Sequence, residues 1–200
     1  MGSVGIKATA FGVAINFLLF LLKLYVGIST NSLSVYCDSI NNLGDTFSCL
    51  IGLLGFYLVV RLDEKRGRRA QSLASFVIGA VVTVTGAYFA YSGLERLMYP
   101  IPVSYSVNYA ILILLTVFVK LSMGIFYLHV NKKSQSPVIK ALSLDSFMDT
   151  FITLTAFLGF TLAEKINFAV DGIVAVIMGI TVAVTALKTV ISQTKYLINN

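Results

Sequence analysis

Long apolar runs, separated by short polar breaks, dominate the pattern of this 200-residue chain. A helix needs about 20 apolar residues to cross the hydrocarbon layer of a bilayer. Six runs are long enough, and they cover residues 8–29, 33–60, 70–98, 104–130, 137–161 and 168–192. The first run is too long for a signal-peptide core and has no cleavage pattern, so we expect it to be retained. The pattern predicts an all-α membrane protein with six transmembrane helices in one domain over residues 1–200.

Small residues recur every seven positions in the third and sixth runs. Small side chains at this spacing let two membrane helices approach closely. We therefore expect the third and sixth helices to pack as a pair, although glycine is also common in membrane helices in general. The residues concerned are Gly79, Gly86 and Gly93 in the third run, and Gly172, Gly179 and Ala186 in the sixth.

Composition supports a membrane protein. Hydrophobic residues make up 57% of the chain and charged residues only 12%, about half the charged share of an ordinary soluble domain. The mean hydropathy is +0.87. The net charge of +6 does not indicate nucleic-acid binding, because the basic residues cluster in the breaks between apolar runs.

The positions of the basic residues predict the orientation in the membrane. Cytoplasmic loops carry an excess of lysine and arginine. The break Arg61–Arg69, the region 132–140, and Lys7 and Lys195 all fall on one side if six helices alternate in direction. We therefore expect a multi-pass protein of the cell membrane with both termini in the cytoplasm.

Four of the nine acidic residues lie inside apolar runs: Asp38, Asp45, Asp145 and Asp149. One charged aspartate at the centre of a bilayer costs at least ~2.5–3.5 kcal/mol. Four would cost on the order of 10 kcal/mol, as much as the stability of a typical domain. A lysine, a proton or a metal ion must therefore offset these charges.

Spacing indicates which acids act together. Asn41 and Asp45 are four residues apart, as are Asp145 and Asp149, so each pair shares one helix face. The two faces together would surround one point with four oxygen-bearing side chains, a site for a cation. Asn41 to Phe47 also resembles Asp145 to Phe151, as in transporters with internal repeats. Asp38 lies on the same stripe as Asp45 and would be a second site, an entry group or a proton carrier.

Other partners and ligands remain open. The intramembrane lysines Lys23 and Lys120 could pair with the aspartates, although two lysines cannot neutralise four acids. Cys37, one turn from Asn41, is a less favoured soft ligand, and both Cys37 and Cys49 fit buried packing thiols. Two cysteines exclude a disulfide framework.

The ligand types favour a hard metal ion. Carboxylate and amide oxygens suit manganese, magnesium and calcium, whereas zinc and copper favour imidazole or thiolate. Clustered buried carboxylates also hold protons when no cation is present, because burial and mutual repulsion oppose their ionisation. The residues thus suggest exchange of a divalent metal for protons, with no bound cofactor.

These motifs resemble the transmembrane domain of the cation diffusion facilitator family over essentially the whole chain. The segment from Asn31 to Thr46 is similar to the family's second helix, and Ser136 to Asp149 to its fifth. The end of the third run, Gly93 to Pro100, is also similar. The resemblance implies a homodimeric exporter that moves metal out and protons in by alternating access. Its zinc carriers place histidine in the site, whereas this chain has Asn41 and Asp145 there, as in the family's manganese exporters.

Two departures from the family accompany the resemblance. The break Arg61–Arg69 has no histidine for an extra zinc site. Members usually continue into a cytoplasmic ferredoxin-like domain, and this sequence stops at Asn200, where that domain would begin. The usual C-terminal cytoplasmic domain is absent from this sequence, which is either part of a longer protein or a naturally short member. We expect a Mn²⁺ exporter, with a Zn²⁺, Fe²⁺ or Co²⁺ exporter as the alternative. A cation channel and a non-transporting scaffold are less favoured, and no nucleophile–base set or nucleotide loop suggests an enzyme.

Overall fold

A computed structural model describes residues 2–61, 64–134, 137–167 and 169–199, and the surroundings of side chains within 5–54, 68–132, 139–167 and 169–198. This part of the chain is all-helical, which confirms the predicted fold class. The helices are α1 (Gly2–Thr30), α2 (Leu33–Arg61), α3 (Glu64–Met98), α4 (Val107–Ser134), α5 (Pro137–Lys165) and α6 (Ala169–Asn199).

The helices extend beyond most of the predicted apolar runs. The third begins at Glu64 instead of residue 70, and the sixth continues to Asn199 instead of residue 192. Apolar length reports only the part of a helix within hydrocarbon, while the hydrogen-bonded backbone continues into the polar layer. Within the charged break Arg61–Arg69, Leu62 and Asp63 lie outside the described residues.

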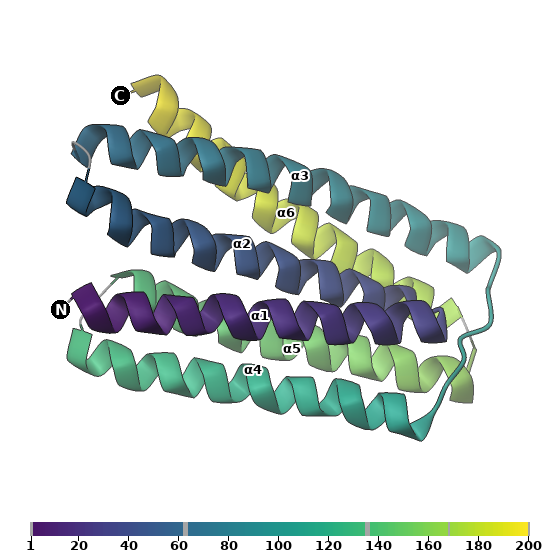
Figure 1. Cartoon of the computed structure of the whole chain (residues 1–200). Helices are drawn as coiled ribbons and strands as arrows, with labels where there is room; N and C mark the ends of the chain where they lie inside the picture. Colours follow the sequence, from purple (N-terminus) through teal and green to yellow (C-terminus); the bar gives the residue numbers. More distant parts are fainter. Residues whose placement is uncertain (1, 62–63, 135–136, 168, 200) are drawn as a thin grey trace.

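Short connections make successive helices antiparallel, so the chain runs up and down through one bundle. Figure 1 shows the N-terminus and the C-terminus at the same end of this bundle. In the same view α1, α2, α4 and α5 lie together, and α3 and α6 lie along the side of α2. This arrangement places the acidic stretches of α2 and α5 in the interior.

The packing of α3 against α6 confirms the predicted pair, which makes the most extensive contact of any two helices. The helices are antiparallel, so Gly93 meets Gly172 and Gly86 meets Gly179. A Cβ atom at Gly179 would lie 2.5 Å from the backbone nitrogen of Ala90, and one at Gly86 would lie 2.6 Å from that of Ala183. The two backbones are therefore in direct contact, which only glycine permits at these positions.

Five of the six helices are long and apolar enough to span a membrane within the described residues. The helix that does not meet this criterion is α2, which carries Asp38, Asn41, Asn42 and Asp45 among its apolar residues. Large apolar side chains cover the outside of the bundle, such as Val84 on α3, which is 71% exposed. An exposed apolar surface of this extent is suited to lipid.

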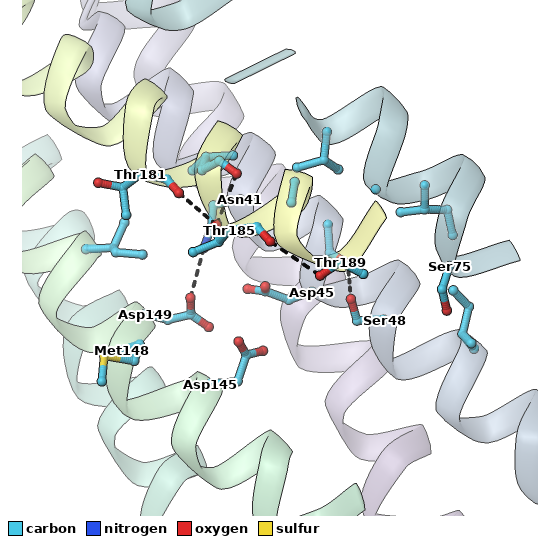
Figure 2. A pocket seen from close by; sticks show the side chains of 18 of the residues that line it. Asn41, Asp45, Ser48, Ser75, Asp145, Met148, Asp149, Thr181, Thr185 and Thr189 are labelled. Carbon is cyan, nitrogen blue, oxygen red and sulfur yellow. Dashed lines mark hydrogen bonds between the residues drawn. The ribbon is translucent and has the colours of Figure 1, made fainter. Parts of the chain in front are cut away.

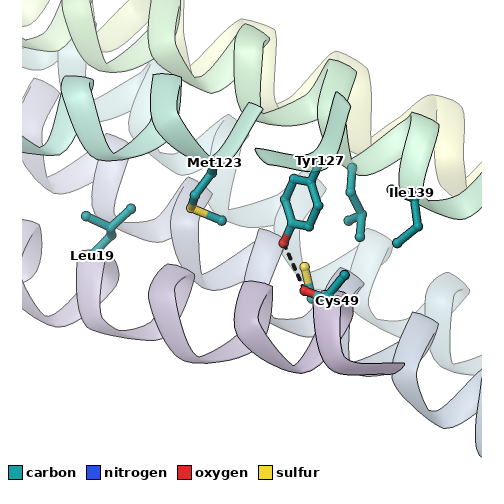
Figure 3. Close-up of a cluster of buried hydrophobic side chains, with 7 residues drawn as sticks. Leu19, Cys49, Met123, Tyr127 and Ile139 are labelled. Atoms are coloured by element: carbon teal, nitrogen blue, oxygen red, sulfur yellow. Dashed lines mark hydrogen bonds between the residues drawn. The ribbon is translucent and has the colours of Figure 1, made fainter. Parts of the chain in front are cut away.

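A hydrophobic cluster joins α1, α2, α4 and the start of α5 near the end that holds the termini (Figure 3). Tyr127 lies at its centre and is fully buried, and its hydroxyl donates a hydrogen bond of 3.4 Å to the carbonyl of Ala8. The ring reaches α1 because Gly12 has no side chain; a Cβ there would collide with the Tyr127 hydroxyl and press on Cys49 Sγ.

A polar network ties the helices together at the opposite end. Asp171, at the start of α6, is fully buried. Its carboxylate accepts hydrogen bonds from the Ser32 hydroxyl at 2.7 Å, from the Leu33 backbone at 2.7 Å and from both the backbone and the hydroxyl of Ser34. Arg96, from the end of α3, forms an ion pair with the same carboxylate at 2.8 Å.

Arg96 also donates to the backbone carbonyl of Asn31 at 2.5 Å. Asn31 lies between α1 and α2 and has a φ of 57°, a left-handed conformation that asparagine tolerates better than most residues. The Asp171 carboxylate therefore caps the start of α2, while Arg96 fastens α3 to the turn before it. Together the two side chains connect the α3–α6 pair to the α1–α2 turn.

Candidate metal site

The structure brings the four predicted ligand residues of α2 and α5 together (Figure 2). One carboxylate oxygen from each of Asp45, Asp145 and Asp149 lies within 4.8 Å of the others. Asn41 Nδ2 donates a hydrogen bond of 2.8 Å to Asp149 Oδ1. Oxygen ligands lie about 2.0–2.6 Å from a divalent cation, so two ligands on opposite sides of it are about 4–5 Å apart. The three carboxylates thus have the spacing of a coordination sphere.

These carboxylates border a cavity of about 520 Å³ between α2 and α5 on one side and the α3–α6 pair on the other. Asp145 is exposed to this space, whereas Asp149 is only 4% exposed. No hydrogen bond or ion pair reaches Asp145 among the residues that the structure describes. Asp145 is therefore the acid of the group that makes no ion pair with Lys120, whereas Asp45 and Asp149 both do.

Hydroxyl groups lie among the apolar side chains that line the remainder of the cavity. Thr181, Thr185 and Thr189 form one stripe of α6, and each hydroxyl donates to the carbonyl four residues earlier. Their oxygens consequently keep lone pairs that can accept a hydrogen bond or face a cation. Ser75 and Thr189 lie in the halves of α3 and α6 nearer the termini, so the polar lining continues from the carboxylates toward that end.

Lys120 of α4 is the neighbour that sequence analysis placed only among alternatives. Its side chain is 1% exposed. The ammonium lies 2.8 Å from Asp45 Oδ2 and 2.6 Å from Asp149 Oδ2, and it donates a third hydrogen bond of 2.7 Å to Asn16 Oδ1. Asn16 in turn donates to Cys49 Sγ at 3.7 Å. One lysine therefore joins α1, α2 and α5 through three different acceptors.

Asp38 lies outside this group. Lys23 of α1 forms an ion pair with Asp38 at 2.8 Å, and the ammonium also donates to the Thr153 hydroxyl at 2.7 Å. Thr153 bonds the other Asp38 oxygen at 3.3 Å. All three side chains are buried. The alternative of pairing with lysine therefore accounts fully for Asp38. For Asp45 and Asp149 it holds in part, because these two carboxylates share one partner, Lys120.

Two softer side chains, a thiol and an imidazole, lie away from the three clustered carboxylates. Cys37 is 1% exposed and packs among Phe89, Ala156 and Met178. His129 is on an exposed face of α4, where its Nδ1 contacts the carbonyl of Ile125 at 2.9 Å. Neither side chain lines the cavity.

The site lies near the middle of the helices. Asn16 is the central residue of α1, and Asp45 and Asp149 each lie twelve residues beyond the first residue of a 29-residue helix. Asn16 and Lys120 are 104 residues apart, and the same separation relates Asn41 to Asp145 and Asp45 to Asp149. Each half of the chain comprises three helices. Because three is an odd number of crossings, the second half is inverted relative to the first, as in many transporters with a binding site at the midplane.

This repeat spacing is the signal that could have identified Lys120 from sequence. The resemblance between residues 41–47 and 145–151 fixes the offset of 104, and applying it to Asn16 leads directly to Lys120. The α6 hydroxyl stripe was also missed, although its spacing of four residues, at Thr181, Thr185 and Thr189, is visible in the sequence.

Comparison with known proteins assigns the chain to a family. Residues 10–198 match the model of the cation efflux transmembrane domain. An uncharacterized transporter from Methanocaldococcus jannaschii is 25% identical over 186 residues, which cover 91% of this chain and 66% of the relative. The chain thus spans slightly less than two thirds of that relative. With a six-helix bundle and an α3–α6 pair, this match shows that the chain belongs to the cation efflux family, the cation diffusion facilitators.

Proposed function

We propose that this protein carries a divalent metal cation, Mn²⁺ in preference to others, across the cell membrane in exchange for protons. The transported ion is bound by Asp45, Asp145 and Asp149, with the side-chain oxygen of Asn41 as the fourth ligand. The observation that supports this most directly is the grouping of three carboxylates within 4.8 Å beside a cavity. Membership of the cation efflux family supports a metal cation transporter rather than an enzyme.

The preference for manganese rests on the chemistry of the ligands. The proposed set offers only oxygen, which suits Mn²⁺ better than Zn²⁺. The soft side chains Cys37, Cys49 and His129 do not line the cavity. To bind the metal, the Asn41 amide turns its oxygen toward the ion, which releases the bond that its nitrogen makes to Asp149.

Proton exchange follows from the burial of the acids. Several unneutralised carboxylates at the middle of a membrane are unstable together. When the metal leaves, protons replace its charge, and the next metal releases them. Asp38, held by Lys23 and Thr153, is a structural partner or a proton carrier in this scheme rather than a metal ligand.

The direction of access is proposed from the two ends of the bundle. The hydroxyl lining continues toward the end that holds both termini, while Arg96 and Asp171 tie the opposite end. With both termini in the cytoplasm, as the basic residues favour, this conformation accepts metal from the cytoplasm. Alternating access would then separate the Arg96–Asp171 network and close the cytoplasmic end, with two copies of the chain forming the family's homodimer.

Flux into proteoliposomes tests the proposal. The chain and its Asp149→Ala variant are reconstituted with a pH gradient, and uptake of Mn²⁺ and Zn²⁺ is followed with a metal-sensitive dye. We expect saturable, gradient-dependent Mn²⁺ flux that exceeds Zn²⁺ flux and is lost in the variant. Equal flux in the variant would exclude this site. Zinc preference with loss in the variant would retain the site and overturn the metal, and non-saturable flux would indicate a channel.

A further inference from the structure

Lys120 makes the most unusual contacts of the proposed metal site. An ammonium has three N–H donors, and all three are used: toward Asn16 Oδ1, Asp45 Oδ2 and Asp149 Oδ2, at 2.6–2.8 Å. Two of the three acceptors are carboxylates proposed to bind the transported ion. A positive charge of the protein itself therefore lies where the positive charge of the cargo is expected.

The contacts place the lysine against oxygens that the metal would also use. Both oxygens of Asp149 already accept a bond from the protein, Oδ1 from Asn41 and Oδ2 from Lys120. Each oxygen has a second lone pair, so a metal bound to one of these oxygens would lie only about 4 Å from the donor that contacts the same oxygen. Asn41 can turn its amide and present oxygen, but an ammonium has only donors, and its positive charge is repelled by the metal.

We propose that the Lys120 ammonium is a tethered competitor of the transported cation, which binds Asp45 and Asp149 between transport events and moves toward Asn16 when a divalent ion enters. This inference rests on the proposed function, because it concerns the same carboxylates. Asn16 can hold the displaced ammonium because its oxygen already accepts one of the three bonds, and its amide is held in turn by Cys49.

The tethered charge also determines which ionic charge fits the site. Three carboxylates at −1 each and one ammonium at +1 give the group a formal charge of −2. One divalent ion neutralises this charge, whereas a monovalent ion leaves −1 and a trivalent ion leaves +1. In a low-dielectric interior an uncompensated charge is unfavourable. Lys120 thus selects divalent ions by charge and limits how tightly they are held, so that they can leave.

The test compares opposite changes at one position. Lys120→Met keeps a long flexible side chain without the charge, and Lys120→Arg keeps the charge in a planar group that bonds carboxylates in pairs. Mn²⁺ binding to the purified full chain is measured by titration calorimetry. Removal of a unit charge a few ångströms from the metal should strengthen binding of Lys120→Met by about ten- to a hundredfold. Lys120→Arg should bind more weakly than the parent.

Two further measurements separate competition from a structural role. Tb³⁺, followed by its luminescence, should gain affinity in Lys120→Met by a larger factor than Mn²⁺, because the site would carry −3. In proteoliposomes Lys120→Met should lower KM and kcat together, since tight binding slows release. A structural defect would raise KM. Lys23→Met is the matched control, because it removes the other buried lysine, which pairs with Asp38, and should change Mn²⁺ affinity far less than Lys120→Met.

The outcomes distinguish this inference from the proposed function. If Asp149→Asn binds Mn²⁺ like the parent, the site itself is wrong and the inference falls with it. If Asp149→Asn loses binding while Lys120→Met binds no tighter than the parent, the site stands and the tethered competitor is rejected. Should Lys120→Met fail to fold, Lys120→Arg decides, and binding as tight as in the parent overturns the inference.

Discussion

Replacement of Gly179 by alanine should separate α3 from α6. The new Cβ atom would lie 2.5 Å from the Ala90 nitrogen and 2.7 Å from the Gly86 oxygen, whereas ordinary contacts begin at 3.4 Å. The shortfall is 0.7–0.9 Å, and both obstacles are backbone atoms that cannot rotate aside. The helices must therefore move apart by nearly that distance, and a gap of this size forfeits a quarter to a half of the attraction of each separated atom pair.

The expected loss of stability combines two effects. Overpacking costs about 1–3 kcal/mol, and the better helix propensity of alanine returns up to about 1 kcal/mol. Because the collision is with backbone, we expect a net loss of about 1–2 kcal/mol. For a chain of this size that corresponds to a decrease in melting temperature of about 2–8 °C.

The assay uses the two cysteines. Cys37 and Cys49 are free and only 1% and 2% exposed, so a thiol-reactive fluorescent dye labels them when the bundle unfolds. Gly44→Ala is the matched control, because its Cβ would meet only Val82 Cγ2 at 3.6 Å, an ordinary contact. The control should melt at or above the parent temperature. If Gly179→Ala also melts there, the reasoning from backbone contact is refuted.

Three further predictions concern the polar groups. Asp171→Ala should cost about 3–5 kcal/mol, because it leaves the Arg96 charge buried without its partner; the same melting assay checks this, and an unchanged melting temperature would contradict it. Asp38→Asn should lower stability by leaving Lys23 without a counterion, yet Mn²⁺ affinity measured by calorimetry should fall far less than in Asp149→Asn, because Asp38 is not one of the three clustered carboxylates. Thr185→Val keeps the shape of the α6 stripe but removes a hydroxyl from the cavity. Flux assays should show a higher KM for Mn²⁺ with an unchanged melting temperature. An unchanged KM would show that this hydroxyl does not lie on the path of the ion.

The periodic features of the fold could be predicted from sequence, because they depend on local patterns. Apolar length located six helices, and the spacing by sevens of Gly79, Gly86 and Gly93 identified the face of α3 that meets α6. The spacing by four of Asp145 and Asp149 likewise placed both carboxylates on one face. These predictions succeeded because a helix converts sequence spacing directly into position on a face.

The contacts made across helices could not be predicted in the same way. The sequence around Asp171 did not indicate the partners of its carboxylate. They depend on how the α1–α2 turn meets the end of α3 and the start of α6. The assignment of Lys120 to two aspartates at once, and of Lys23 to Asp38 alone, depends on the depth of each helix in the bundle. The sequence showed that two lysines and four aspartates lie within the helices, but it did not indicate which lysine pairs with which aspartate.

The division of the lysines between the aspartates has a consequence for the order in which the newly made chain enters the membrane. α2, the helix whose described residues do not meet the criterion for a membrane span, emerges directly after α1, which supplies Lys23 as the partner of Asp38. The first hairpin can thus leave the translocon with that charge already neutralised. Asp45 has no such early partner, because Lys120 follows 75 residues later in α4. Until α4 is synthesised the nascent chain must keep Asp45 protonated or near water, so the proposed metal site is completed late in biogenesis.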